Sequence, residues 1–96
     1  MIHPRPMTDL EEEVLFRLSD HRVALPVVVL ADEISGSTGK TIPLATVYRT
    51  ILRLSEDGLI DVVDSRSRRQ YRITDAGLNA LQQEWNYHRQ LLKNHA

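Results

Sequence analysis

The chain has 96 residues, no cysteine and a formal net charge of −1. This length fits one small domain, and the lack of cysteine excludes disulfide bonds and thiolate metal sites. No apolar run is long enough to span a membrane and no signal-peptide pattern is present, so we expect a cytoplasmic protein without a membrane partner. No serine–histidine or paired-carboxylate arrangement stands out either. We therefore expect neither an enzyme nor a bound cofactor.

The first third of the chain predicts an arm and two helices. Residues 1–7 contain two prolines and predict a flexible arm. Thr8 and Glu11 have the spacing of a capping box, which predicts a helix from there to about Ser19. Pro26 fits the first position of a second helix, which ends in the glycine- and serine-rich stretch that follows. Two neighbouring valines in that second segment also allow a strand.

The centre of the chain predicts a helix followed by a hairpin. The helix begins at Pro43 and stops at Gly58, and the three residues before it predict a short extended piece. Residues 59–63 and 69–73 then predict two strands joined by a turn at 64–67. The helix has apolar residues spaced to face a core, namely Leu44, Val47, Ile51 and Leu54.

The last predicted helix is capped by Thr74 and runs to roughly Lys93. Its apolar and aromatic residues recur at alternating spacings of three and four, the pattern by which one helix packs along another. We therefore predict a homodimer held by Leu78, Leu81, Trp85, His88 and Leu92. A second interpretation makes Trp85 a flat wall for a small aromatic effector, with Tyr87 and His88 lining the same space.

Charge is unevenly distributed along the chain. Residues 1–39 carry three arginines against seven acidic residues, whereas residues 40–72 carry seven basic against four acidic residues. Positive charge is therefore concentrated in the third helix and the hairpin. A local basic patch attracts phosphates even when the whole chain is slightly acidic.

The outer side of the third helix and the hairpin together predict a surface for double-stranded DNA. Arginine pairs with guanine in the major groove, and threonine contacts a thymine methyl group or a phosphate. Basic hairpin residues suit a wing that touches phosphates or a minor groove. The alternatives are a solvated helix face and a charged turn that protects an edge strand. The candidate DNA-binding residues are Thr46, Tyr48, Arg49, Thr50, Arg53, Arg66, Arg68 and Arg69.

Three segments within this region, residues 46–48, 53–60 and 68–77, resemble the recognition helix, strand and wing of the PadR family of bacterial transcriptional regulators. The resemblance implies an α+β, mainly helical fold, a winged helix-turn-helix with a C-terminal dimerisation helix. Residues 1–75 would form the DNA-binding domain and residues 76–96 the dimerisation helix, as in the smaller subfamily. It also implies a homodimeric repressor that binds a palindromic operator.

Three other interpretations remain. Residues 44–50 look like the ferric-uptake-regulator family, but the histidines that a metal domain needs are scattered and lack a close carboxylate, so we expect no metal. Residues 36–41 suggest a phosphate loop, yet Ile34 stands where its first glycine belongs. The remaining alternative is a winged helix that binds another protein without specific DNA binding. The four histidines are His3, His21, His88 and His95.

Overall fold

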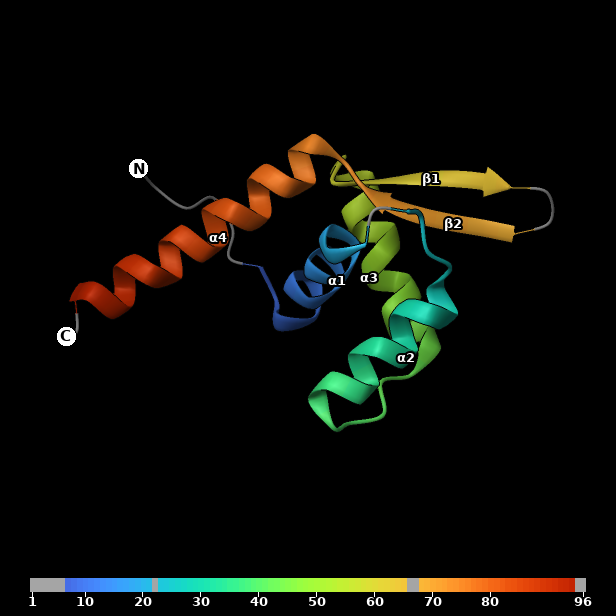
Figure 1. The fold of residues 1–96 in the computed structure, drawn as a ribbon, viewed down its shortest axis with the longest axis horizontal. Helices are drawn as coiled ribbons and strands as arrows, with labels where there is room; N and C mark the ends of the chain where they lie inside the picture. Colours follow the sequence, from blue (N-terminus) through green and yellow to red (C-terminus); the bar gives the residue numbers. More distant parts are fainter. Residues whose placement is uncertain (1–6, 22, 66–67, 95–96) are drawn as a thin grey trace.

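The computed structural model describes residues 7–21, 23–65 and 68–94. The helices are α1 (Asp9–Asp20), α2 (Val27–Thr38), α3 (Leu44–Glu56) and α4 (Asp75–Asn94), and the strands are β1 (Ile60–Ser65) and β2 (Arg68–Ile73). The predicted α+β, mainly helical class is confirmed (Figure 1). Within the described ranges, none of the helices combines the length and the apolar character needed to cross a membrane.

Helix α1 begins at the predicted capping box. The Thr8 hydroxyl accepts a hydrogen bond from the Glu11 backbone N–H at 3.1 Å, and the Glu11 carboxylate accepts one from the Thr8 N–H at 2.9 Å. Two N–H groups that the helix leaves unpaired are thereby satisfied. The helix ends at Asp20, one residue beyond the predicted end.

Segment 27–38 is a helix, so the strand interpretation of its valines is wrong. Leu30 and Ile34 are buried one turn apart, whereas Val28 and Val29 are exposed. The helix continues to Thr38 and ends at Gly39, which adopts a left-handed conformation with φ of 71°. The glycine-rich stretch is therefore the end of a helix, and the sequence interpretation that rejected a phosphate loop agrees with this geometry.

Helix α3 packs into the core through Val47, Ile51 and Leu54, as predicted. It stops at Asp57 and Gly58, where Gly58 has a φ of 76°. The prediction that Leu44 faces the core is wrong, because its side chain is 47% exposed. Leu44 is the first residue of α3 and follows an exposed Pro43, so this end of the helix projects past the core.

The hairpin is longer than predicted and is joined by a third strand segment. In β1 and β2, Ile60 pairs with Ile73 at one end and Ser65 with Arg68 at the other. On the free side of β2, the backbone of Leu25 exchanges two hydrogen bonds of 2.8 Å with that of Tyr71. The predicted extended piece at residues 40–42 has no assigned strand pairing, so Leu25 supplies the third segment of the wing.

Helix α4 leaves the hairpin, lies along α1 and then extends away from the body of the protein (Figure 1). The Thr74 hydroxyl accepts a hydrogen bond from the Gly77 N–H at 3.0 Å and donates one to the Gly58 carbonyl at 2.8 Å. The start of α4 is thereby tied to the end of α3. All residues from 85 to 93 are exposed, and α1 contacts this half of the helix through Trp85 and His88.

Candidate nucleic-acid interface

The outer face of α3 carries two exposed arginines, Arg49 and Arg53. Within the described ranges, neither arginine takes part in an ion pair. Thr46 and Thr50 are half-buried beside them, and the Thr50 hydroxyl donates a hydrogen bond to the Thr46 carbonyl at 3.0 Å. Of the predicted contact residues on α3, the two arginines are therefore the more accessible to a ligand. The two threonines lie at the side of this face.

The same helix also has an exposed apolar part, which was not predicted from the sequence. Leu44 is 47% exposed and Leu52 is 39% exposed, and Ala45 in the first turn of α3 is exposed as well. Small apolar side chains on a helix can contact thymine methyl groups in a major groove. Their positions in the sequence place these residues away from the buried face formed by Val47 and Ile51, and this spacing could have revealed them. Leu44 was missed because it also fits the edge of that buried apolar face.

Tyr48 joins α3 to the wing. A hydrogen bond with the Tyr48 hydroxyl raises the pKa of the Arg69 guanidinium, and the nearby Asp64 carboxylate raises it further. Burial, followed by the neighbouring Tyr48, raises the pKa of Tyr71 above its ordinary value. Tyr48 thus lies toward β2, close to a wing arginine.

The wing is less positive than the sequence indicates. The Arg69 Nε lies 3.6 Å from Asp64 Oδ1, and Arg72 Nη2 lies 3.9 Å from Asp61 Oδ2. Arg68 is exposed and has no acidic partner in the part of the chain that the structure describes. Arg66 lies outside the described residues.

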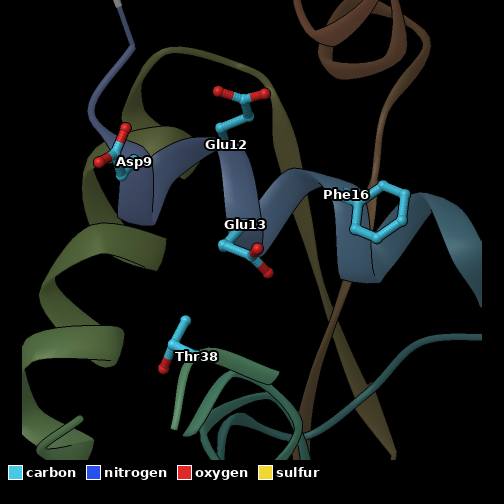
Figure 2. A pocket seen from close by; sticks show the side chains of 5 residues that line it. All are labelled: Asp9, Glu12, Glu13, Phe16 and Thr38. Carbon is cyan, nitrogen blue, oxygen red and sulfur yellow. The ribbon is translucent and has the colours of Figure 1, made fainter. Parts of the chain in front are cut away.

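A hollow of about 360 Å³ lies between α1 and the end of α2 (Figure 2). Figure 2 shows the carboxylates of Asp9, Glu12 and Glu13 projecting from α1, with Thr38 across from Glu13 and Phe16 a turn further along. Three negatively charged carboxylates around one hollow repel the negatively charged phosphate groups of DNA. This hollow is therefore not part of the candidate DNA surface.

The residues predicted to hold the dimer, which we call the dimer seam, are Leu78, Leu81, Trp85, His88 and Leu92, and they fall into two groups. Leu78 is 38% exposed and Leu92 is 74% exposed, so both remain available to a second chain. Leu81 is only 1% exposed and belongs to the hydrophobic core, and its assignment to a dimer interface is wrong. The first turns of α4 pack on α1 and β2, so the heptad pattern there serves contacts within one chain.

The remaining seam residues contact α1. The Trp85 indole N–H donates a hydrogen bond to Glu12 Oε1 at 3.0 Å, and its ring meets that of Phe16 edge-on at 5.9 Å. His88 Nε2 lies 3.3 Å from Glu84 Oε1, which corrects the expectation that the histidines lack a close carboxylate. Tyr87, the third predicted effector residue, is 42% exposed.

Solved structures share this arrangement of helices and wing. YusO from Bacillus subtilis has a TM-score of 0.81 and 18% identity over 93% of this chain and 60% of its own. RosR from H. salinarum has a TM-score of 0.78 and 17% identity over 90% of this chain and 77% of its own. A transcriptional regulator from Clostridium thermocellum has a TM-score of 0.72 and 22% identity over 88% and 87% of the two chains.

These neighbours are winged-helix transcriptional regulators, and the fold of this chain is the winged-helix fold. At such low identities the likeness shows the fold alone. No protein-family model matches the chain, and no curated protein matches it.

Proposed function

We propose that this protein is a sequence-specific, DNA-binding transcriptional regulator. The observation that carries the proposal is the outer face of α3, where Arg49 and Arg53 are exposed with no ion-pair partner among the described residues. A winged-helix fold offers such a helix to a major groove. The resemblance of the wing segment to the PadR family supports the same function and points to its small, single-helix subfamily.

In the proposed complex, α3 enters the major groove and the wing follows the backbone. Arg49 and Arg53 pair with guanine or position the helix on phosphates, and Leu44 and Ala45 contact thymine methyl groups. Arg68, which is exposed at the start of β2, contacts the flanking phosphates. The protein acts as a homodimer on a palindromic operator, with its two recognition helices about 34 Å apart or a multiple of it. A repressor role follows from the PadR resemblance.

The distal half of α4 is the proposed dimer contact, because Leu91 is 40% and Leu92 is 74% exposed on the part of the helix that extends away from the body of the protein (Figure 1). We expect Leu92→Glu to convert the dimer to a monomer by placing a charge in an apolar contact. Analytical ultracentrifugation measures the change. Gln83→Glu adds the same charge on the opposite side of α4 and is the matched control. A wild-type monomer, or equal loss in both variants, would contradict this contact.

The experiment that tests the function is selection of random duplexes by the purified chain, followed by sequencing and salt titration of the enriched site. An enriched palindrome whose affinity falls steeply with salt is the expected result, since phosphate contacts release counterions. Weak binding at low salt without enrichment would instead favour the alternative of a protein-interaction module.

A small aromatic effector is the remaining part of the proposal. The chain has a single tryptophan, so fluorescence reports on Trp85 alone. We expect a planar aromatic acid or amine bound between two copies of α4, near Trp85, Tyr87 and His88, to change that emission and to alter the affinity for DNA. The titration is run in a chelating buffer that removes metal ions. Unchanged emission across a panel of planar aromatics would count against an effector.

A further inference from the structure

Three potential metal-ligating side chains meet where α4 lies on α1. Glu12 comes from α1, and Glu84 and His88 come from consecutive turns of α4. One donor atom from each residue can be chosen so that all three lie within 4.8 Å of one another. The His88 Nε2 atom is 3.3 Å from Glu84 Oε1 and 3.9 Å from Glu12 Oε2. The cluster combines one imidazole with two carboxylates drawn from separate helices.

The local structure orients this cluster. Residues four positions apart share one face of a helix, so Glu84 and His88 point to the same side of α4. The Trp85 indole N–H holds Glu12 Oε1 at 3.0 Å, which leaves Oε2 of the same carboxylate toward His88. Hydrogen bonds of this kind, which orient a ligand from outside, are typical of metal sites. Trp85 is therefore a positioning residue for Glu12.

We propose that Glu12, Glu84 and His88 form a three-ligand site for a divalent transition-metal ion of the Zn²⁺ type. Two donor atoms bound to one tetrahedral Zn²⁺ are about 3.3 Å apart, because each bond is about 2.0–2.2 Å long. The separation of His88 from Glu84 already has this value. His88 Nε2 and Glu12 Oε2 are 3.9 Å apart, and a small shift of the imidazole, which is 52% exposed, shortens this distance while Glu12 keeps its hydrogen bond to Trp85.

Charge and exposure support the same assignment. The Glu84 side chain is 2% exposed, and a second carboxylate, that of Glu12, lies beside the same imidazole. A divalent ion would balance the charge of both carboxylates, while neutral His88 would donate its Nε2 lone pair. His88 is 52% exposed, so water can reach the site and fill a remaining coordination position.

The donor set selects among ions. Ca²⁺ and Mg²⁺ prefer oxygen ligands alone, and thiolate-loving ions have no ligand in a chain without cysteine. Imidazole with carboxylate suits Zn²⁺ and related first-row ions. The site spans α1 and α4 within one chain and does not depend on the proposed DNA binding.

Calorimetric titration of metal-free, full-length protein with ZnCl₂ near neutral pH tests the proposal. We expect saturable binding of one Zn²⁺ per chain, with Co²⁺ giving the visible absorption of a bound ion in competition with Zn²⁺. Trp85→Phe keeps an aromatic ring but removes the indole N–H, and should weaken affinity by about 10–100-fold. His88→Ala and Glu12→Gln remove a ligand and should weaken it further. Glu84 is not substituted, because it is buried.

Two controls separate this site from other histidines. His21 lies 2.9 Å from Glu33, but the two form no three-ligand group within the described ranges, so His21→Ala should bind Zn²⁺ like the wild type. A variant with both His3→Ala and His95→Ala should also keep its affinity. Circular dichroism confirms that each variant is folded. No saturable binding by the wild type, unchanged binding by His88→Ala, or loss of binding in either control would overturn the proposal.

Discussion

Gly77→Ala is expected to lower the free energy of unfolding by about 1–3 kcal/mol. A Cβ atom at position 77 would overlap the Leu59 carbonyl oxygen and come within 2.7 Å of Ile73 Cγ1. The same Leu59 carbonyl oxygen accepts a hydrogen bond from the Thr74 N–H at 3.0 Å. It therefore cannot move away from position 77 without weakening the hydrogen bond that joins the hairpin to the start of α4. Thermal unfolding followed by circular dichroism measures the loss, with about 4–8 °C expected per kcal/mol.

Gly36→Ala is the matched control for this prediction. Gly36 lies inside α2, and a Cβ atom placed there meets nothing within 4 Å. Alanine is the better helix former by about 0.5–1 kcal/mol, so this variant should be slightly more stable than the wild type. We expect the unfolding temperature to fall for Gly77→Ala and to rise slightly for Gly36→Ala. A shift in the same direction for both variants would show that the close approach of α4 to Leu59 does not exclude a side chain at position 77.

Arg49→Ala is expected to weaken binding to the selected operator by roughly 5–150-fold, the loss of about 1–3 kcal/mol for one bidentate pair with guanine. Arg49 is exposed on α3 and has no ion-pair partner among the described residues, so its removal leaves no buried charge behind. Binding to a random duplex should fall much less, because phosphate contacts dominate there. Fluorescence anisotropy on both duplexes, over a range of salt concentrations, separates the two contributions.

Arg68→Ala provides the contrast. If Arg68 contacts a phosphate, its removal weakens binding to both duplexes by a similar factor and reduces the salt slope by about one. Arg89→Ala removes an exposed arginine from the distal half of α4 and should leave both affinities unchanged, provided the dimer remains intact. Equal losses for Arg49→Ala on the two duplexes would make Arg49 a phosphate contact instead of a base contact.

The elements with strong local signals were predictable from the sequence. The spacing of Val47, Ile51 and Leu54 defines the inner face of α3, and Pro43 and Gly58 mark its ends. The Thr8 capping box marks the start of α1 in the same way. These features depend on residues within a few positions of one another, so a single sequence contains the whole pattern.

The contacts between distant segments could not be predicted. Leu25 pairs with Tyr71 through its backbone, and a single paired residue has no periodicity to reveal it. The heptad spacing of α4 is the same whether the partner helix belongs to a second chain or to α1, so Leu81 was assigned to the wrong contact. Glu12 lies far from His88 in sequence, and only the packing of α4 on α1 brings them together.

The link between Tyr48 and Arg69 has a consequence for the energetics of association. A long arginine side chain that is free in solution loses rotational freedom when it is held against a ligand, at a cost of about 0.5–1.5 kcal/mol. Asp64, whose Oδ1 lies 3.6 Å from Arg69 Nε, and Tyr48 are neighbours of Arg69 before any duplex is present. A guanidinium has five N–H donors, so those that face away from both partners remain free to meet a phosphate. Each rotamer of Arg69 that these two neighbours exclude in the free protein is one that binding does not have to remove, so the wing would lose less side-chain entropy on reaching the duplex.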